Sequence, residues 1–267
     1  MKVLTLLTCY NRREKTKKAI LGLIEGNPGI DFLFLAVDAG STDGTLEALV
    51  EFSNVTVIQG HPGLYYSNGM RLAMEQAKKQ QSTFDYCLLI NDDVEFYDRA
   101  VEKLAEKSGG LYVIVGPTCD REGTLSYGAI KYDAGIKYHI LGIKESDIKA
   151  DTFNANCVII PWRIFMEADL MDSHYVHSLG DFDYGLMLRD RGNSIYTLNE
   201  YVGVCEDNPV DGTWEDPELP VIDRIKDKES LKGVPFGQWF YFLKKNFGLT
   251  RAVWSSLTPY MRIILHR

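Results

Sequence analysis

The stretch Cys87–Phe96, CLLINDDVEF, places two adjacent aspartates directly after a run of apolar residues. A run such as Tyr86–Ile90 is typical of a strand that is buried on both faces of a sheet. Two carboxylates at the end of such a strand repel each other and lose hydration, so a positive partner is expected beside Asp92 and Asp93. A divalent cation would satisfy them. The simpler alternative is that one aspartate caps the following turn, as aspartate often does.

The first half of the chain alternates short apolar runs with amphipathic segments. The apolar runs predict strands at Val3–Leu7, Phe32–Val37, Val55–Gln59 and Tyr86–Ile90. The segments between them predict helices at Lys15–Ile24, Thr45–Phe52 and Asn68–Lys79. Alternation of this kind predicts βαβ units with right-handed crossovers and an α/β fold built on a mostly parallel sheet.

Ligands of such sheets bind beyond the carboxyl ends of the strands. Three polar clusters have that position, each directly after an apolar run: Thr8–Arg12, Asp38–Gly44 and Asn91–Asp93. They are far apart in the sequence, yet the fold would bring them to one edge of the sheet. Capping of one turn by Asp92 or Asp93 would not explain three polar clusters at the same edge, so the pattern favours a binding site.

The second half of the chain is less regular. It predicts strands at Tyr112–Gly116, Phe153–Pro161 and Ile195–Leu198, helices at Arg163–Ala168 and Phe182–Arg191, and a loop at Asn208–Asp223. Two basic, aromatic segments then predict helices at Phe236–Phe247 and Arg251–Leu265, the second interrupted by Pro259. A helical extension therefore follows the α/β region.

The composition is that of an ordinary globular protein, with 45% hydrophobic and 25% charged residues in a chain of 267. Five scattered cysteines without a CxxC pair fit a reducing cytoplasm and argue against a disulfide framework or a structural zinc site. The N-terminus lacks the cleavage region of a signal peptide, and no apolar run approaches the ~20 residues of a spanning helix. We therefore expect a cytoplasmic protein that is not integral to a membrane.

The charge is unevenly distributed along the chain. The net charge is −8, but residues 230–267 contain no acidic side chain and carry +6, which leaves −14 for residues 1–229. A basic amphipathic segment such as residues 236–267 can lie on an anionic membrane, where each cation contributes about 1 kcal/mol. The equally weighted alternative is a helix packed on the body of the protein or on a second copy in a homo-oligomer. Nucleic acid is not expected as a partner, because the acidic body would repel phosphate.

Four motifs resemble those of glycosyltransferase family 2, in the same order and spacing. They are LTCYNR (7–12), VDAGSTDGT (37–45), LLINDDVEF (88–96) and GDFDYGLMLRDRG (180–192), and they cover roughly residues 1–206. The resemblance implies a GT-A catalytic domain over residues 1–229, an inverting sugar transfer, and a helical extension over residues 230–267. GLYYSNGMRLA (63–73) is similar to a segment of rhamnosyl- and galactofuranosyl-transferring members. The C-terminal sequence resembles members that act on bacterial surface polysaccharides such as O-antigen or capsule.

In this family the acidic motif after the fourth strand holds Mg²⁺ or Mn²⁺ against the diphosphate of a nucleotide-sugar donor. Hard cations of this kind take oxygen ligands and neutralise the leaving group. The resemblance implies that Asp93 is the metal ligand and that Asp92 lies near the ribose or the metal's waters. Asn91 departs from the all-acidic motif, which weakens the metal site or supplies a ribose contact. Cys205 stands where members often carry a metal-binding histidine, and we expect it to be structural because thiolate is softer than Mg²⁺ prefers.

An inverting transferase needs a general base on the acceptor hydroxyl, and the resemblance gives this role to Asp181. The same aspartate can cap the helix that follows, and the two roles can coexist. Gly180 replaces the acidic neighbour that is usual in the family. The candidates for the acceptor site are Asp183, His174 and His177; Asp183 points to another face of the helix and holds either structure or an acceptor hydroxyl.

The donor contacts implied by the resemblance lie in the first half of the chain. Thr8 and Arg12 reach the nucleotide and diphosphate, Asp38 reaches the base, and Asn68 and Arg71 are further contacts. Arginine fits because its guanidinium pairs with phosphate oxygens in a bidentate way. Asp38 can accept the imide N–H of a pyrimidine, so we expect a UDP- or dTDP-sugar. The expected acceptor is a glycan or a lipid-linked glycan, with the enzyme peripheral on the inner face of the membrane.

The sequence leaves two other functions open. A sugar nucleotidyltransferase shares the fold type but usually has a glycine-rich loop after its first strand, which TCYNRREK lacks. A non-catalytic glycan-binding relative is favoured by Gly180, Asn91 and Cys205, which depart from the family pattern.

Overall fold

A seven-stranded sheet forms the core of the computed structural model, which describes residues 1–207 and 209–265. The strand order is β12-β6-β11-β4-β1-β2-β3. The neighbours pair in parallel except β11, which is antiparallel to both β4 and β6. The mostly parallel sheet predicted from the sequence is confirmed. Its strands are β1 (Lys2–Cys9), β2 (Asp31–Asp38), β3 (Val55–Gln59), β4 (Tyr86–Ile90), β6 (Val113–Val115), β11 (Cys157–Pro161) and β12 (Ile195–Thr197).

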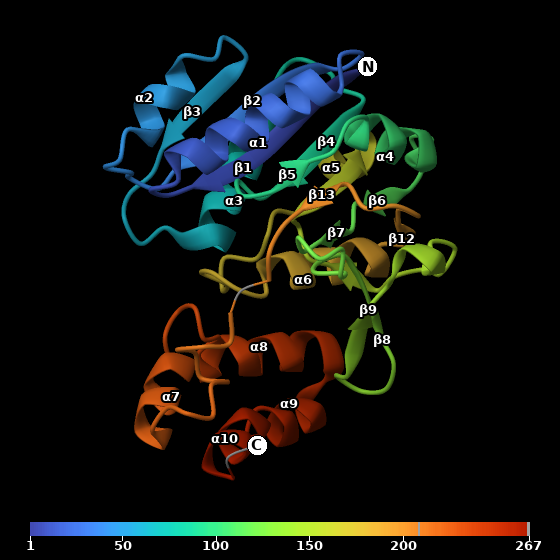
Figure 1. The fold of residues 1–267 in the computed structure, drawn as a ribbon. Coiled ribbons are helices and arrows are strands. Elements are labelled where there is room, and N and C mark those ends of the chain that lie inside the picture. Colours follow the sequence, from blue (N-terminus) through green and yellow to red (C-terminus); the bar gives the residue numbers. More distant parts are fainter. Residues whose placement is uncertain (208, 266–267) are drawn as a thin grey trace.

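Helices cover both faces of this sheet (Figure 1). One face carries α1 (Arg13–Gly26), α2 (Thr45–Val50) and α4 (Ala100–Ser108), and the other carries α3 (Tyr65–Ala77), α5 (Trp162–Glu167) and α6 (Gly180–Asp190). Successive side chains of a strand point to opposite faces, so in β1 Leu6 packs on the α3 side and Leu7 on the α1 side. Both faces are therefore apolar, which explains the unbroken hydrophobic runs in the sequence.

Two small sheets lie next to the main one. The first has the order β10 (Thr152–Phe153), β8 (Ala129–Tyr132) and β9 (Tyr138–Ile140), and the 3₁₀ helix η1 (Ile143–Glu145) lies in the connection from β9 to β10. The second has the order β5 (Glu95–Phe96), β13 (Gly203–Val204) and β7 (Thr118–Cys119). The chain that leaves β4 enters this second sheet at β5. The acidic motif therefore lies between the main sheet and a small one.

The prediction of one strand over Phe153–Pro161 is wrong. Phe153 pairs with Ala129 in a small sheet, whereas Cys157 pairs with Ile90 in the main sheet. The chain turns at residues 154–156 between the two, and the Asn91 amide donates to the carbonyl of Asn156 at 3.1 Å. This turn lies beside the acidic end of β4.

Four helices form the C-terminal part of the structure: α7 (Val221–Lys228), α8 (Phe236–Phe247), α9 (Leu249–Ser255) and α10 (Thr258–Ile264). The loop prediction over Asn208–Asp223 is wrong at its end, where α7 begins, and Asn208 lies outside the described residues. The buried Arg224 of α7 donates to the carbonyl of Ile263 in α10 at 3.5 Å. The expected boundary after residue 229 thus falls between helices of one packed group (Figure 1).

The expected interruption near Pro259 is present. Pro259 stands in the first turn of α10, where a missing backbone N–H costs no intrahelical bond. In α8, Phe242 and Leu243 pack against Tyr175 and Leu186 of the α/β body. Among the described residues, no helix combines the length and apolar character needed to cross a membrane.

Candidate active site

Arg12 joins the N-terminal polar cluster to the acidic motif. Its Nη1 donates to Asp92 Oδ1 at 3.0 Å and to Asp93 Oδ2 at 2.7 Å. The contact follows from the sheet, because β1 lies next to β4 in register and both strands end at the same edge. The positive partner expected for the two aspartates therefore comes from within the protein.

The two aspartates lie in different environments. Asp92 is 5% exposed, and its Oδ2 accepts a hydrogen bond from Thr16 Oγ1 at 3.2 Å. Burial raises the pKa of Asp92 to about 6, although Arg12 opposes the shift. The Asp93 side chain is 24% exposed and faces a cavity of about 290 Å³. Asp93 is thus the carboxylate that a ligand can reach.

This cavity carries charges of both signs. Its cations are Arg12, Lys15, Lys18 and Arg121, and its carboxylates are Asp93, Glu95, Glu206 and Asp207. Three of the carboxylates are already paired, since Asp93 accepts from Arg12 at 2.7 Å, Glu95 accepts from Lys18 at 2.6 Å and Glu206 contacts Arg121 at 3.3 Å. The cations suit a polyphosphate, while Asp93 offers oxygen to a cation.

Cys205 lies beside Asp93. Its Sγ is 3.8 Å from Asp93 Oδ1, and Asn156 Nδ2 donates to it at 3.4 Å. Burial and the charge of Asp93 raise the pKa of the thiol to about 12, so it stays protonated at neutral pH. The described residues include no group of three or more His, Cys, Asp or Glu side chains arranged as a metal site. The protein alone would supply few ligands to an ion at Asp93.

Asp38 is held at the end of β2. It is 3% exposed, and the Ser41 amide donates to its two oxygens at 3.3 and 3.2 Å. The loops after β1 and β2 are also bonded to each other, because the Thr42 amide donates to Asn11 Oδ1 at 2.8 Å. Asn11 adopts a left-handed conformation with φ 51°, a conformation more common for asparagine than for most residues. Asp38 and Arg12 therefore stand on one connected loop pair.

Asp181 is the second residue of α6. Its Oδ2 accepts the Ala155 amide at 3.1 Å, and its Oδ1 accepts the Phe182 amide at 2.9 Å. Burial raises the pKa of Asp181 to about 6 despite these backbone donors. The residue before α6, Leu179, has φ 70°, which is a strained conformation for a branched side chain. The carboxylate is thus fixed, partly buried and, with a pKa of about 6, mostly ionised at neutral pH.

The turn at residues 154–156 connects the two candidate carboxylates. The Ala155 amide bonds to Asp181, and the Asn156 side chain bonds to Cys205, whose thiol contacts Asp93. Adjacent residues of one turn therefore link the acidic end of β4 to the N-terminus of α6.

The start of α3 lies between Thr8 and α6. A Cβ on Gly69 would approach Thr8 Oγ1 to 2.5 Å, and a Cβ on Gly180 would lie 2.8 Å from Ser67 Cβ and closer still to Ser67 Oγ. Ser67 Oγ also donates to the His177 carbonyl at 2.6 Å. The absence of a side chain at residue 180 therefore has a steric reason, because α3 and α6 touch at that position.

Two buried polar atoms near the start of α6 have no hydrogen-bond partner among the described residues: Tyr66 Oη and His177 Nδ1. Burial and the charge of Asp181 raise the pKa of Tyr66, which places that hydroxyl in the field of the carboxylate. Burial, followed by the charges of Lys232 and Arg12, lowers the pKa of His177. Sequence reasoning selected His177 but missed Tyr66, whose only signal was its place in GLYYSNGMRLA.

Asn68 and Arg71, the two further donor contacts predicted from the sequence, lie in different places. Asn68 stays near the site, and its amide donates to the Val176 carbonyl at 3.4 Å. Arg71 instead donates to the Met171 carbonyl and lines a second cavity of about 240 Å³, with Asp172, Asp183 and Lys245. The structure does not bring Arg71 to Arg12 and Asp93.

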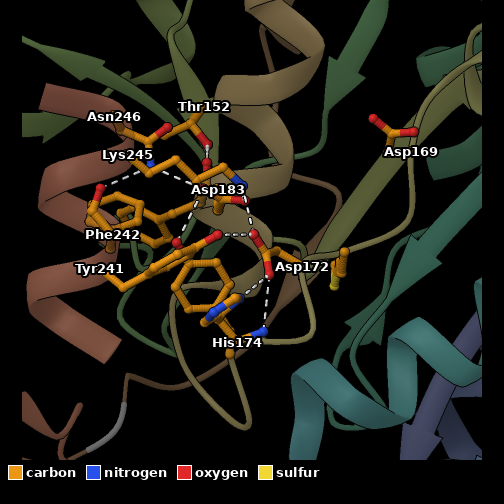
Figure 2. A network of polar contacts seen from close by, with 12 residues as sticks. Thr152, Asp169, Asp172, His174, Asp183, Tyr241, Phe242, Lys245 and Asn246 are labelled. Atoms are coloured by element: carbon orange, nitrogen blue, oxygen red, sulfur yellow. Dashed lines mark hydrogen bonds and ion pairs between the residues drawn. The ribbon is translucent and has the colours of Figure 1, made fainter. Parts of the chain in front are cut away.

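Asp183 and His174 belong to a polar network around this second cavity (Figure 2). Asp183 is 2% exposed and accepts from Lys245 Nζ at 2.7 Å, Asn246 Nδ2 at 2.9 Å and the Tyr175 hydroxyl at 3.1 Å. His174 stacks on Tyr241 with ring centroids 3.8 Å apart. The Asp183 carboxylate is thus satisfied by protein groups.

Comparisons with known proteins give a family for the chain and two similar structures. The model of the family described as Glycosyl transferase family 2 matches residues 5–166. TarS of S. aureus (residues 1–349) has a similar structure, with a TM-score of 0.58 and 14% identity over 99% of this chain and 81% of that one. The mannosyltransferase PcManGT from Pyrobaculum calidifontis, in complex with GDP-Man and Mn²⁺, gives a TM-score of 0.56 and 13% identity over 98% and 78% of the two chains. No curated protein sequence matches the chain. The structural likeness confirms the expected GT-A-like α/β fold.

Proposed function

The chain belongs to glycosyltransferase family 2, and from this premise we propose that it moves a sugar, with inversion, from a nucleotide donor to a bacterial surface glycan. One observation carries the proposal. Asp93 and Asp181 are linked through the turn at Ala155 and Asn156, which supports assigning the carboxylate next to the cationic cavity and the carboxylate of α6 to one site. An inverting transfer needs a donor-side group and a base arranged in this way.

The donor diphosphate would lie in the cavity at Asp93. Arg12, Lys15 and Lys18 line it and can pair with phosphate oxygens. Asp38, fixed by Ser41 at the neighbouring strand end, would accept the imide N–H of uracil or thymine. The resemblance of residues 63–73 favours a rhamnosyl or galactofuranosyl donor carried by dTDP or UDP.

Mg²⁺ or Mn²⁺ fits the oxygen donors at this edge. Among the described residues, Oδ1 of Asp93 has only the weak thiol contact of Cys205 at 3.8 Å, and Arg12 balances one of the two carboxylate charges. Asp93 would hold the ion, with further ligands from the diphosphate and water. A bound ion neutralises charge on the leaving nucleoside diphosphate. The Mn²⁺ in the complex of PcManGT supports this reading.

Asp181 would take the proton of the acceptor hydroxyl. The acceptor oxygen bonds to the anomeric carbon while the bond from that carbon to the donor phosphate oxygen breaks on the opposite face. A pKa of about 6 leaves Asp181 mostly ionised at pH 7.5 yet more basic than an exposed aspartate. The amides of Ala155 and Phe182 hold the carboxylate in one orientation for this step.

The acceptor we propose is a glycan carried on a lipid at the inner face of the membrane, such as an O-antigen or capsule intermediate. His177 is an acceptor candidate beside the start of α6, since Ser67 donates to its carbonyl and also packs on Gly180. Asp183 and His174 would then support the site through the network around Lys245.

Asp181→Asn tests the base assignment. We expect turnover to fall at least ~100-fold, because the amide cannot take a proton in the transition state. Donor affinity should change less than about threefold, measured as Mn²⁺-dependent thermal stabilisation by UDP- and dTDP-sugars. In the unmodified enzyme, kcat should rise with pH through about 6, as Asp181 loses its proton.

Asp190→Asn is the matched control, because Asp190 is exposed at the other end of the same helix. It should keep the turnover of the unmodified enzyme. Asp93→Asn should remove the Mn²⁺-dependent part of donor stabilisation. Near-normal turnover of D181N would make the base assignment wrong, and donor binding without transfer or hydrolysis in the unmodified chain would favour a non-catalytic glycan-binding relative.

A further inference from the structure

The outer side of α9 and α10 is apolar and exposed. Its side chains, with their exposed fractions, are Leu249 (59%), Val253 (47%), Trp254 (76%), Leu257 (50%), Met261 (57%) and Ile264 (60%). The inner side is buried and includes Ala252, Ser256 and Ile263. We call the six outer side chains the α9–α10 face.

The α9–α10 face is continuous across the junction of the two helices. Leu249, Val253, Leu257 and Met261 are four residues apart, so they follow one another along a helical surface. Scattered apolar residues are normal on a protein surface, but a contiguous set of large ones marks an interaction site. The face therefore needs an occupant.

The charge around the face favours an anionic occupant. Residues 230–267 contain no acidic side chain, and Lys244 and Arg251 are exposed. Arg262 is already engaged, because it contacts Glu215 at 3.7 Å and its guanidinium lies 5.7 Å from the centre of the Trp214 ring. Glu229, from the end of α7, accepts a hydrogen bond from the Tyr260 hydroxyl. The nearby acids that contact α10 are thus paired.

A second copy of the chain is a poorer occupant than a lipid surface. A twofold contact would set the same patch against itself and bring like cations together. We propose that the α9–α10 face docks on an anionic bilayer, with Trp254 and the aliphatic side chains at headgroup depth and Arg251 near lipid phosphates. The proposal rests on the proposed function only in that a lipid-linked acceptor gives the bilayer a role.

The docked face would stand close to the catalytic body. α8 connects directly to α9 through Gly248, and Leu243 of α8 packs on Leu186 of α6, the helix that begins with Gly180 and Asp181. Docking would therefore hold this side of the enzyme at the membrane that carries the acceptor.

The test is flotation of the full chain with vesicles, in the absence of donor and acceptor. Vesicles of phosphatidylcholine in which about one lipid in three is phosphatidylglycerol should bind the protein. Vesicles of pure phosphatidylcholine should bind it at least ~10-fold less. The triple variant W254S/L257S/M261S should lose at least ~10-fold of the binding to anionic vesicles. Arg251→Glu should weaken that binding about threefold or more and reduce its salt dependence.

Matched controls separate the face from general stickiness. V50S/L111S/I148S removes three exposed apolar side chains on other parts of the surface, and Lys79→Glu reverses an exposed charge on the body; both should bind vesicles like the unmodified chain. Equal binding by W254S/L257S/M261S would overturn the proposal. So would a dimer of the unmodified chain that this variant converts to monomer, because the face would then be covered by a second copy. Transfer to a soluble acceptor analogue reports on the proposed function separately.

Discussion

Gly180 illustrates how one residue can be explained by packing where the sequence suggested lost function. Family resemblance leads one to expect an acidic side chain at this position. In the structure a Cβ here would lie 2.8 Å from Ser67 Cβ, at the contact between α3 and α6. Only glycine allows that approach without displacing one of the two helices. The small size of Gly180 therefore sets how closely α3 approaches the start of α6, where Asp181 lies.

Gly180→Ala should destabilise the protein. The added methyl group overpacks the α3–α6 contact, so we expect a loss of about 1–3 kcal/mol in the free energy of unfolding. Turnover should also fall, because Asp181 is the next residue. Urea unfolding and kcat under saturating donor would measure the two effects.

Gly237→Ala is the matched control for this substitution. Gly237 also lies in the first turn of a helix, but a Cβ there meets no atom within 4 Å. We expect it to stabilise α8 by up to about 1 kcal/mol, because alanine has the higher helix propensity. If both variants unfolded at the same urea concentration as the unmodified chain, the close contact at Gly180 would be refuted.

At the scale of elements, α8 holds α6 through a small set of side chains. Lys245 Nζ bridges Asp183 Oδ2 at 2.7 Å and Asp172 Oδ2 at 2.8 Å, and Asn246 adds a hydrogen bond to Asp183 (Figure 2). Burial opposes ionisation of Asp172, yet hydrogen bonds from Lys245 and His174 keep its pKa below its ordinary value. The C-terminal helices are therefore tied to the helix that presents Asp181.

Lys245→Met should loosen this connection. It leaves the buried Asp183 without its cation, so we expect a loss of about 2 kcal/mol or more in stability. Because α6 also carries Asp181, kcat should fall by about 10-fold while donor affinity changes little. The pH at which kcat reaches half its plateau should move below that of the unmodified enzyme, since a looser α6 exposes Asp181 to water.

Lys244→Met provides the control for the loss of one lysine from α8. Lys244 is exposed and adjacent in sequence. It should keep the stability, kcat and pH dependence of the unmodified enzyme. An unchanged pH profile in Lys245→Met, with stability alone reduced, would show that Lys245 supports the fold without positioning Asp181.

How far the sequence predicts these elements depends on the length of each apolar signal. The sequence predicts the strands at Val55–Gln59 and Tyr86–Ile90 with their observed bounds. Tyr86–Ile90 is a continuous apolar run, which identifies a buried strand, whereas Val55–Gln59 alternates and forms the partly exposed edge strand β3. The hairpin of β8 and β9 was missed because it is short and partly exposed, with Tyr138 50% exposed. Pairings that depend on the folded chain, such as Phe153 with Ala129, leave no local pattern.

The same limit applies to the candidate site. The motifs place Arg12 and the aspartates at strand ends, and the parallel sheet brings them to one edge as predicted. The ion pair of Arg12 with Asp92 joins residues 80 positions apart and could not be predicted from spacing. Arg71 shows the reverse, because its motif position suggested the donor site while its helix face directs it to Met171 and Glu75.

At the scale of the whole molecule, the stability depends on carboxylates with opposite pKa shifts. Burial raises the pKa values of Asp92 and Asp181 to about 6. Hydrogen bonds lower the pKa values of Asp43 and Glu95, and Asp172 is also lowered. The groups with a raised pKa favour the folded state in acid, and the groups with a lowered pKa favour it near neutrality. The free energy of unfolding of the unmodified chain, measured against pH, therefore sums these contributions and does not resolve any one of them.

Comparing two variants isolates Asp181. The unfolded chain releases this proton near the ordinary pKa of 3.8 and the folded chain near 6, so between these values the folded state binds more protons. Stability from this group is therefore complete below 3.8 and is lost as the pH rises to 6. Asp181→Asn removes the dependence, so its stability relative to the unmodified chain should increase between pH 4.5 and 6.5 by on the order of 2 kcal/mol, then stay constant. Urea unfolding at each pH measures it; a flat difference for D181N would mean that Asp181 has the pKa of an exposed aspartate and is not the buried base proposed here.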